Sequence, residues 1–419
     1  MADQDLDMIG TRRQGATMTD RIVALLCGVA LVGVYLMPSQ SGASFATYAL
    51  AVTVLVSGRD RWRAFAQQRL LAGLFVALLG YFASSVWWSA EWSLRGTFSV
   101  YSRCVLMLTF VVALATSLVR VPEFQLWLVR AVAIAGAIAA SAALIGLWRH
   151  PTWDGRLVGF GQLRSSVVAA LAFAASGVFA ADMALSDSSR WRVVGAVCAA
   201  VIALAIFETG SRAGYLSAAV GLWSLVVFKR WPSARGRVVW LVLPILGAAV
   251  AGAIALLAAD GAPSPLFPRG DSFRFEIWAA EWQRLQVAPV FGLGILTGDA
   301  VALEGRTFVH PHSLYLSAAL QGGLVGLLLL SGVLGCAAWA LIHRAQRRIA
   351  QLGLALLVAG ASGYAFDGWE LIDKVGLSWL LLWLPVAAAL AVGTSEGNTR
   401  DMVNRDSPAR CRSTDGSAS

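Results

Sequence analysis

Charged residues are scarce in this chain. Only 14% of its 419 residues are Asp, Glu, Lys or Arg, whereas an ordinary soluble domain contains about a quarter, and 58% are hydrophobic. This composition excludes an ordinary soluble enzyme. The formal net charge of +9 does not indicate a nucleic-acid partner, because the basic residues stand in short connectors between apolar runs, where they act as topology signals.

Three other signals are missing. The five cysteines include no Cys-x-x-Cys pair, so the sequence indicates neither a disulfide framework nor a structural zinc site. No small-residue cleavage site follows the first apolar run, which is therefore expected to span a membrane rather than to be removed as a signal peptide. No Asp-x-Asp pair stands at the end of an apolar run to bind Mg²⁺ or Mn²⁺ beside a phosphate, so we expect no metal site and no cofactor.

Acidic residues come closest to a cluster near the end of the chain. Asp367, Glu370 and Asp373 would share one face if this segment were helical. Outer rims that are lined by Asp are commonly only solvated. We therefore expect these three carboxylates to be in contact with water.

The chain contains many long apolar runs. Many of them approach the roughly 20 residues with which a helix crosses a bilayer. We place spans at 21–37, 43–57, 70–88, 97–118, 126–148, 164–185, 191–208, 213–228, 237–259, 313–342, 350–366 and 375–393. The sequence predicts an all-α, polytopic helical membrane protein of about 12 transmembrane helices, with a membrane domain over 21–393, an N-terminal tail over 1–20 and a polar tail over 394–419 that is expected to be disordered.

The basic residues indicate how these spans are oriented. An even number of spans puts both termini on one side, and 22 of the 33 Lys and Arg residues fall on that side. Cytoplasmic connectors carry the excess of basic residues. We therefore expect both termini in the cytoplasm and the long connector 260–311 on the outer face.

The connector 260–311 is the longest on the outer face, and connectors of that length are usually functional. After a proline-rich start, Asp271 or Ser272 can cap a helix that runs to about Val287. Such a helix would lie on the membrane surface or cap the bundle by its tryptophans. Its apolar residues recur at three- and four-residue spacing: Phe275, Trp278, Trp282 and Leu285.

A histidine and two glycines form the most specific motif of the chain. His312-Ser313 is followed by nine residues, then by Gly323, two more residues and Gly326. A histidine at the outer mouth of a span can act as a base near neutral pH, although His312 alone is equally well explained as an interfacial residue at a helix start. Glycines at this spacing let a helix approach its neighbour closely, so we expect a structural role for both.

Further motifs are built around arginines that the topology places on the outer face. The string TGSRAG, residues 209–214, puts Arg212 at the outer edge of the membrane. The string RFEIW, residues 274–278, begins with Arg274 and is followed by Pro289 and by GLG, residues 292–294. Two weaker strings are RLVGF, residues 156–160, and SSVWWSAEWSLRG, residues 84–96.

These motifs resemble the signature of the bacterial O-antigen ligase and O-antigen polymerase superfamily. Its elements are a TGSRG turn, an R-x-x-x-[LW] helix with a trailing P-x-x-G-x-G turn, and a His followed by Asn, Ser or Gln, nine residues and G-x-x-G. The resemblance extends over about residues 80–380 in the expected order. Residues 84–96 resemble an SxxWSxxxxxxxR connector, and Arg156 begins an R-x-x-G-[TF] element that lacks the Asn-Pro-Asn often following it.

The resemblance implies a metal-independent glycosyltransferase of the bacterial inner membrane whose active site faces the periplasm. The donor would be a glycan on undecaprenyl diphosphate, and the acceptor would be lipid A-core or a growing glycan. His312 would remove the acceptor proton or orient the acceptor hydroxyl. Arg212 and Arg274, together with Arg156, would bind the diphosphate, since guanidinium groups bind phosphate in a two-pronged manner and stay charged.

Several alternatives stay open. Ligases and polymerases of O-antigen or exopolysaccharide share these motifs, and the compact outer loop with its string HPHS, residues 310–313, favours a ligase of lipopolysaccharide biosynthesis. Each arginine could instead pair with lipid headgroups at the outer edge. A transporter of lipid-linked sugars would carry charged sites near mid-membrane, for which Arg103 is the main candidate.

The topology can be tested with single cysteines in a background free of native cysteines. We expect a membrane-impermeant thiol reagent to label Ser272→Cys and not Ser57→Cys in cells with a permeable outer membrane, because the basic residues orient the spans in this way. Labelling of Ser57→Cys alone would overturn both the topology and the outer location of the site.

Overall fold

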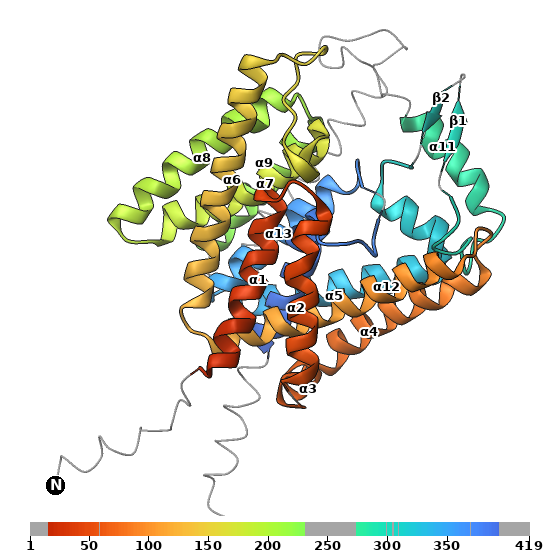
Figure 1. The fold of residues 1–419 in the computed structure, drawn as a ribbon, viewed down its shortest axis with the longest axis horizontal. Helices are drawn as coiled ribbons and strands as arrows, with labels where there is room; N and C mark the ends of the chain where they lie inside the picture. Colours follow the sequence, from red (N-terminus) through yellow and green to blue (C-terminus); the bar gives the residue numbers. More distant parts are fainter. Residues whose placement is uncertain are drawn as a thin grey trace, which may run out of the picture.

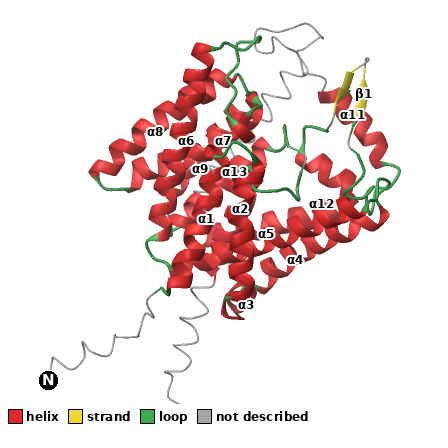
Figure 2. Ribbon diagram, in the orientation of Figure 1, coloured by secondary structure: helices red, strands yellow, loops and turns green. Residues whose placement is uncertain are grey.

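The described part of the chain is mostly helical. A computed structural model describes residues 16–57, 59–230, 274–298, 300–303, 306–308, 310–368 and 370–393. Its elements are α1 (Met18–Leu36), α2 (Gln40–Val56), α3 (Arg59–Ala66), α4 (Arg69–Ser84), the 3₁₀ turn η2 (Ser85–Trp88), α5 (Leu94–Arg120), α6 (Phe124–Arg149), the 3₁₀ turn η3 (Gly161–Leu163), α7 (Ser166–Ser186), α8 (Ser189–Thr209), α9 (Arg212–Arg230), α11 (Arg274–Leu285), α12 (Leu314–His343), α13 (Arg348–Gly363) and the π-helical turn η4 (Trp379–Trp383). The strands β1 (Val301–Leu303) and β2 (Arg306–Phe308) pair as a small antiparallel hairpin (Figures 1 and 2).

The expectation of a polytopic helical membrane protein is confirmed. Within the described residues, seven helices are long and apolar enough to cross a membrane: α1, α4 with η2, α5, α6, α7, α8 and α12. Three shorter apolar helices cover Ser44–Val56, Arg348–Gly363 and Trp379–Gly393. Helix α9 corresponds to the expected span 213–228. The expected span 237–259, most of the two tails and the first part of the connector 260–311 lie outside the described residues.

Helix α7 lies at the centre of the bundle. In the most apolar stretch of α7, 78% of the residues are buried, whereas the corresponding share in α12 is 28%. Helix α7 packs against α6, α8, α9 and α13. A Cβ on Gly136 of α6 or on Gly214 of α9 would lie 2.2 Å from a side-chain atom of α7. Close approach through small residues is how helices gain contact in a membrane, where lipid is as apolar as their side chains. Helix α9, which begins with Arg212, is therefore packed directly against the centre.

Buried ion pairs join the helices on the side where α1 begins and α7 ends. Figure 1 shows the start of α1 and α3 at the opposite end of the molecule from α11 and the hairpin. The pairs are Asp20 with Arg61 and with Arg120 at 3.5 Å, Asp182 with Arg348 and Lys229 at 2.7 Å each, and Asp187 with Arg130 at 2.9 Å and Arg348 at 2.7 Å. Each carboxylate has two cationic partners, which compensate the loss of its hydration.

Helix α12 is interrupted at Gly323. Its φ of 59° and ψ of −160° lie outside the helical region, in a conformation that is essentially restricted to glycine. The break leaves backbone N–H and C=O groups on both sides without partners inside the helix. In an apolar interior such groups have to be satisfied by other parts of the protein.

The turn 289–294, which follows α11, supplies the missing partners. The amides of Leu324 and Val325 donate to the carbonyl oxygens of Pro289 (2.9 Å) and Val290 (3.1 Å), and the amides of Leu293 and Gly294 donate to the carbonyl oxygens of Leu320 (2.7 Å) and Gln321 (3.0 Å). A Cβ on Gly292 would lie 2.4 Å from the backbone nitrogen of Gly323, so the two backbones meet without an intervening side chain. The glycines of both motifs form one structural unit.

Side chains from α4 and η2 contact the same unit from another side. Four hydrogen bonds make the contact: the Tyr81 hydroxyl to the carbonyl oxygens of Gly322 (2.7 Å) and Phe291 (2.9 Å), and the amides of Ile295 and Leu296 to the hydroxyls of Ser85 (3.1 Å) and Ser89 (3.0 Å). Both serines belong to the string SSVWWSAEWSLRG. That string therefore holds the turn after α11 against the break in α12.

The break in α12 can be tested with a pair of glycine variants. We expect Gly323→Ala to lower the melting temperature of the purified protein, because its Cβ would lie 2.3 Å from the Val290 carbonyl oxygen and its backbone would be strained by about 1–3 kcal/mol. Gly335→Ala is the matched control on the same helix: nothing lies within 4 Å of the added Cβ, and Ala favours a helix interior over Gly by about 1 kcal/mol. Equal melting temperatures for the two variants would contradict the break.

Candidate active site

His312 lies just before α12 and contacts a distant carboxylate. Its Nδ1 is 3.1 Å from Oδ1 of Asp367, which follows 55 positions later and is only 4% exposed. Within the described residues His312 is also the one non-glycine residue with a positive φ, at 51°. Such a backbone conformation costs on the order of 1–3 kcal/mol and persists only where surrounding contacts impose it. The fold therefore fixes the imidazole against Asp367 at a cost in backbone energy.

The contacts that impose this conformation come from two sides. The amide of Leu314 donates to the carbonyl oxygen of Tyr364 at 3.0 Å, which ties the start of α12 to the segment that leads to Asp367. From the other side, the indole Nε1 of Trp278 donates to the carbonyl oxygen of Pro311 at 2.9 Å. The segment around His312 is therefore held between α11 and the end of α13.

Helix α11 brings Arg274 toward the same segment. Arg274 begins the helix, and Trp278 follows one turn later on the same face. Trp278 bonds to Pro311 and also packs against Phe366, with 6.3 Å between ring centroids. Arg274 thus lies on the face of α11 that is turned toward His312. Of the two roles expected for this helix, capping of the bundle through a tryptophan describes Trp278, whereas Trp282 is 59% exposed.

His310 is the second histidine of this segment. Its ring meets the ring of His312 edge to face, with centroids 4.0 Å apart. Burial, and next the neighbouring His312, lower the pKa of His310 to about 4, while Asp367 opposes the shift, so His310 is neutral at neutral pH. Ligand atoms of His310, His312 and Asp367 lie within 4.8 Å of one another, and two imidazoles with a carboxylate are a set that zinc accepts.

Arg212 follows a tight turn between α8 and α9. Helix α8 ends at Thr209, Gly210 adopts a left-handed φ of 58°, and the Ser211 hydroxyl caps α9. The Nε of Arg156 donates to the carbonyl oxygen of Thr209 at 2.7 Å. Arg156 is therefore bonded to the turn that presents Arg212, whose side chain is exposed.

The arginine turn and the histidine segment lie at the same end of the bundle. Ser217, in the second turn of α9, donates to the carbonyl oxygen of Ala359 at 2.9 Å, close to the end of α13. From there the chain continues to Asp367. The first turn of α9 and the segment after α13 are consequently neighbours.

The expectation that the acidic residues near the end of the chain are solvated is wrong for Asp367, which is 4% exposed, whereas the side chain of Glu370 is 38% exposed. After α13 the chain leaves the helical conformation, so these residues do not share a helix face. Asp367 is buried against His312, and Glu370 lies 3.8 Å from Arg103, which also donates to the carbonyl oxygen of Ile372 at 3.2 Å. Arg103, the candidate for a mid-membrane charge, thus contacts the segment after α13.

Comparison with known proteins finds similar sequences. A family model described as "O-Antigen ligase" matches residues 197–331. The chain is also 25% identical to an O-antigen ligase of Pseudomonas aeruginosa over 334 residues, which are 76% of this chain and 77% of that protein. In residues 197–331, and more weakly over most of its length, the chain is similar to O-antigen ligases.

The similarity to O-antigen ligases, together with the apolar helices, supports an integral inner-membrane protein of the glycosyltransferase type that ligates or polymerises glycans. The matched segment includes Arg212, Arg274, His312 and Gly323. Asp367 lies beyond it.

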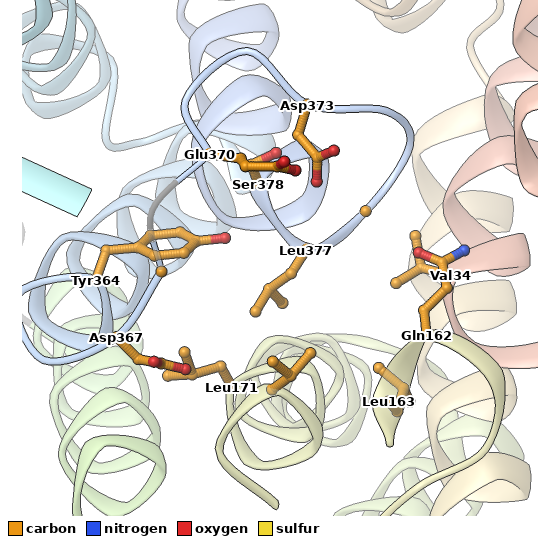
Figure 3. A pocket seen from close by; sticks show the side chains of 13 residues that line it. Val34, Gln162, Leu163, Leu171, Tyr364, Asp367, Glu370, Asp373, Leu377 and Ser378 are labelled. Carbon is orange, nitrogen blue, oxygen red and sulfur yellow. The ribbon is translucent and has the colours of Figure 1, made fainter. Parts of the chain in front are cut away.

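A cavity adjoins the His312–Asp367 pair. Its volume is about 140 Å³, and its lining includes Asp367, Glu370 and Asp373. Figure 3 shows these carboxyl groups and the Tyr364 hydroxyl directed toward one space. Burial, and next the neighbouring Glu370, raise the pKa of Asp373 well above its usual range.

Proposed function

We propose that the chain transfers a glycan from undecaprenyl diphosphate to an acceptor hydroxyl at the periplasmic face of the inner membrane, and that this reaction is ligation of O-antigen to lipid A-core. The observation that carries the proposal is the 3.1 Å contact between His312 Nδ1 and Asp367 Oδ1. A buried carboxylate bonded to one nitrogen of an imidazole is the arrangement that prepares the other nitrogen to act as a base.

Asp367 determines which nitrogen of His312 reacts. Because the carboxylate accepts the hydrogen of Nδ1, Nε2 keeps its lone pair and can take up a proton. The carboxylate then stabilises the imidazolium that forms. General base catalysis of this kind contributes roughly 10²–10⁴-fold to a rate.

The transfer is a displacement at the anomeric carbon of the donor. The acceptor oxygen forms a bond to this carbon, while the bond from the carbon to the phosphate oxygen breaks. The proton of the hydroxyl moves to Nε2 of His312, and the electron pair leaves with the lipid diphosphate. Arg212 and Arg274, together with Arg156, bind the diphosphate and stabilise the charge that develops on it.

The orientation of the protein follows from its charges. Helix α3, at the end of the molecule opposite α11, carries Arg59, Arg61 and Arg63. Cytoplasmic connectors are the basic ones, so this end faces the cytoplasm together with both termini. The site end, with His312 and Arg212, then faces the periplasm, where the glycan donor is displayed.

Loss of the base should remove most of the activity. We expect His312→Ala and Asp367→Asn each to reduce kcat for glycan transfer by roughly 10²–10⁴-fold, because an amide at position 367 favours the tautomer whose Nε2 carries a hydrogen. Transfer to purified lipid A-core is followed by gel mobility, with the amount of protein in the membrane measured in parallel. His343→Ala, a change of an exposed histidine at the far end of α12, is the control that should retain activity.

Treatment with a chelator distinguishes two roles of His312, that of a general base and that of a metal ligand. If His312 acts as a base, transfer continues in EDTA. Loss of transfer in EDTA that zinc or magnesium restores would instead make His310, His312 and Asp367 a metal site, and full activity of His312→Ala would exclude the base.

The proposed role of the arginines is tested with variants that remove the charge or keep it on a differently shaped group. We expect Arg212→Ala and Arg274→Ala to abolish transfer, with losses of roughly 10²–10³-fold or more, because each removes donors from the leaving group. Arg212→Lys should also be severely impaired, since an ammonium group presents one charge rather than a fork. Arg190→Ala, a change of an exposed arginine on α8, is the matched control. Activity of Arg212→Lys equal to wild type would exclude two-pronged binding.

A deletion strain separates ligase from polymerase by the lipopolysaccharide bands on a gel. For a ligase we expect unsubstituted lipid A-core, while long glycan persists on the lipid carrier because its polymerisation does not require this protein. Core that bears one repeat unit would assign the chain to O-antigen polymerisation. Unchanged lipopolysaccharide with loss of a secreted polysaccharide would assign it to exopolysaccharide polymerisation.

A further inference from the structure

The cavity beside Asp367 contains polar atoms that the protein itself does not satisfy. The hydroxyl of Ser378, a residue only 5% exposed, has no hydrogen-bond partner among the described residues. The same is true of the amide nitrogen and oxygen of Gln162. Both side chains line the cavity. Buried polar groups in native proteins nearly always have partners, so these two indicate a ligand with hydrogen-bonding groups.

The acidic side chains of the cavity can both donate and accept hydrogen bonds. Asp373 stands beside Glu370, and burial and that neighbour raise its pKa well above its usual range, which favours the protonated form of Asp373. A protonated carboxyl group can donate one hydrogen bond, whereas an ionised one only accepts. Hydroxyl groups, which do both, match such a surface.

The charge of the cavity selects against phosphate. Three carboxyl groups line it, and its described lining includes neither Lys nor Arg; the cation next to it is Arg103, 3.8 Å from Glu370. Because the carboxyl groups outnumber this cation, an anionic diphosphate is favoured less there than at Arg212 and Arg274. The volume of about 140 Å³ far exceeds the roughly 10–15 Å³ that one water molecule needs, and Leu171 and Leu377 provide an apolar wall. A sugar ring presents hydroxyls at its edge and C–H groups on its faces.

We propose that this cavity binds an unphosphorylated sugar unit of the acceptor glycan, next to the unit whose hydroxyl reacts. The inference rests on the proposed function and extends it to the acceptor. Asp367 is common to both sites, because it contacts His312 through Oδ1 and also lines the cavity. A bound acceptor is therefore anchored beside the base, while the donor diphosphate is directed to the arginines.

Kinetics with two variants test the cavity. For Ser378→Ala and Gln162→Leu we expect the KM for lipid A-core to rise about five- to tenfold, because each removes one or two neutral hydrogen bonds. The KM for the donor and kcat should stay at wild-type values. Ser117→Ala and Gln125→Leu are matched controls, since each removes a buried atom without a partner among the described residues that does not line the cavity.

A merely structural role of the two side chains gives a different result. Removal of an unpartnered buried group should then raise the melting temperature or leave it unchanged, with no effect on the KM for lipid A-core. Unchanged KM values in both variants would overturn the proposal. A rise in the melting temperature of the wild type with Ca²⁺ or Mg²⁺, absent in Ser378→Ala, would overturn it in favour of a cation site.

Direct binding distinguishes this inference from the proposed function. The probe is the core oligosaccharide released from lipid A-core by mild acid, which carries neither lipid nor donor. We expect it to raise the melting temperature of the wild type and of His312→Ala and, at the same concentration, to raise that of Ser378→Ala less. Binding without any transfer to lipid A-core would refute the proposed function alone. Transfer by a wild type whose melting temperature does not respond to the oligosaccharide would refute the cavity alone.

Discussion

Backbone hydrogen bonds between the break in α12 and the turn 289–294 hold the site together. An interrupted helix is stable in an apolar interior only if other backbone supplies the missing partners. Here the partner is the turn that directly follows α11, and it bonds to α12 on both sides of Gly323. One contact thus fixes the helix of Arg274 relative to the helix that follows His312. Ser85 of η2, Ser89 directly after it and Tyr81 of α4 complete the support.

Charged groups of both signs surround His312 at this end of the bundle. Arginines begin α9 and α11, whereas the segment after α13 contributes carboxyl groups to the cavity and pairs Glu370 with Arg103. His312, bonded to Asp367, adjoins the carboxyl groups. Under the proposed function this arrangement directs the phosphate-bearing ligand to the arginines and the hydroxyl-bearing one to the cavity.

The sequence allows prediction of those features that depend on consecutive residues. Apolar length gives the spans, and the spacing in RFEIW gives an amphipathic helix with Arg274 at its start. The bond between His312 and Asp367 joins residues 55 positions apart, and Asp367 stands in an irregular segment where helical periodicity misleads. The motif of Gly323 and Gly326 predicts close helix packing. It does not predict the φ and ψ of Gly323, because these depend on the turn 289–294 that packs against the break. The strands of the hairpin β1–β2 have three residues each, too few for an alternating pattern.

Helix α9 connects the two ends of the molecule. At its last turn Lys229 lies 2.7 Å from the buried carboxylate of Asp182, and at its first turn stands Arg212. Near the middle, Gly221 faces Ala359 of α13 and Val178 of α7, with 2.8 Å from an added Cβ to the Ala359 methyl group. A helix anchored by an ion pair at one end and packed backbone to side chain in the middle resists sliding along its own axis. The position of Arg212 along the axis of α9 is therefore determined from the other end of the molecule.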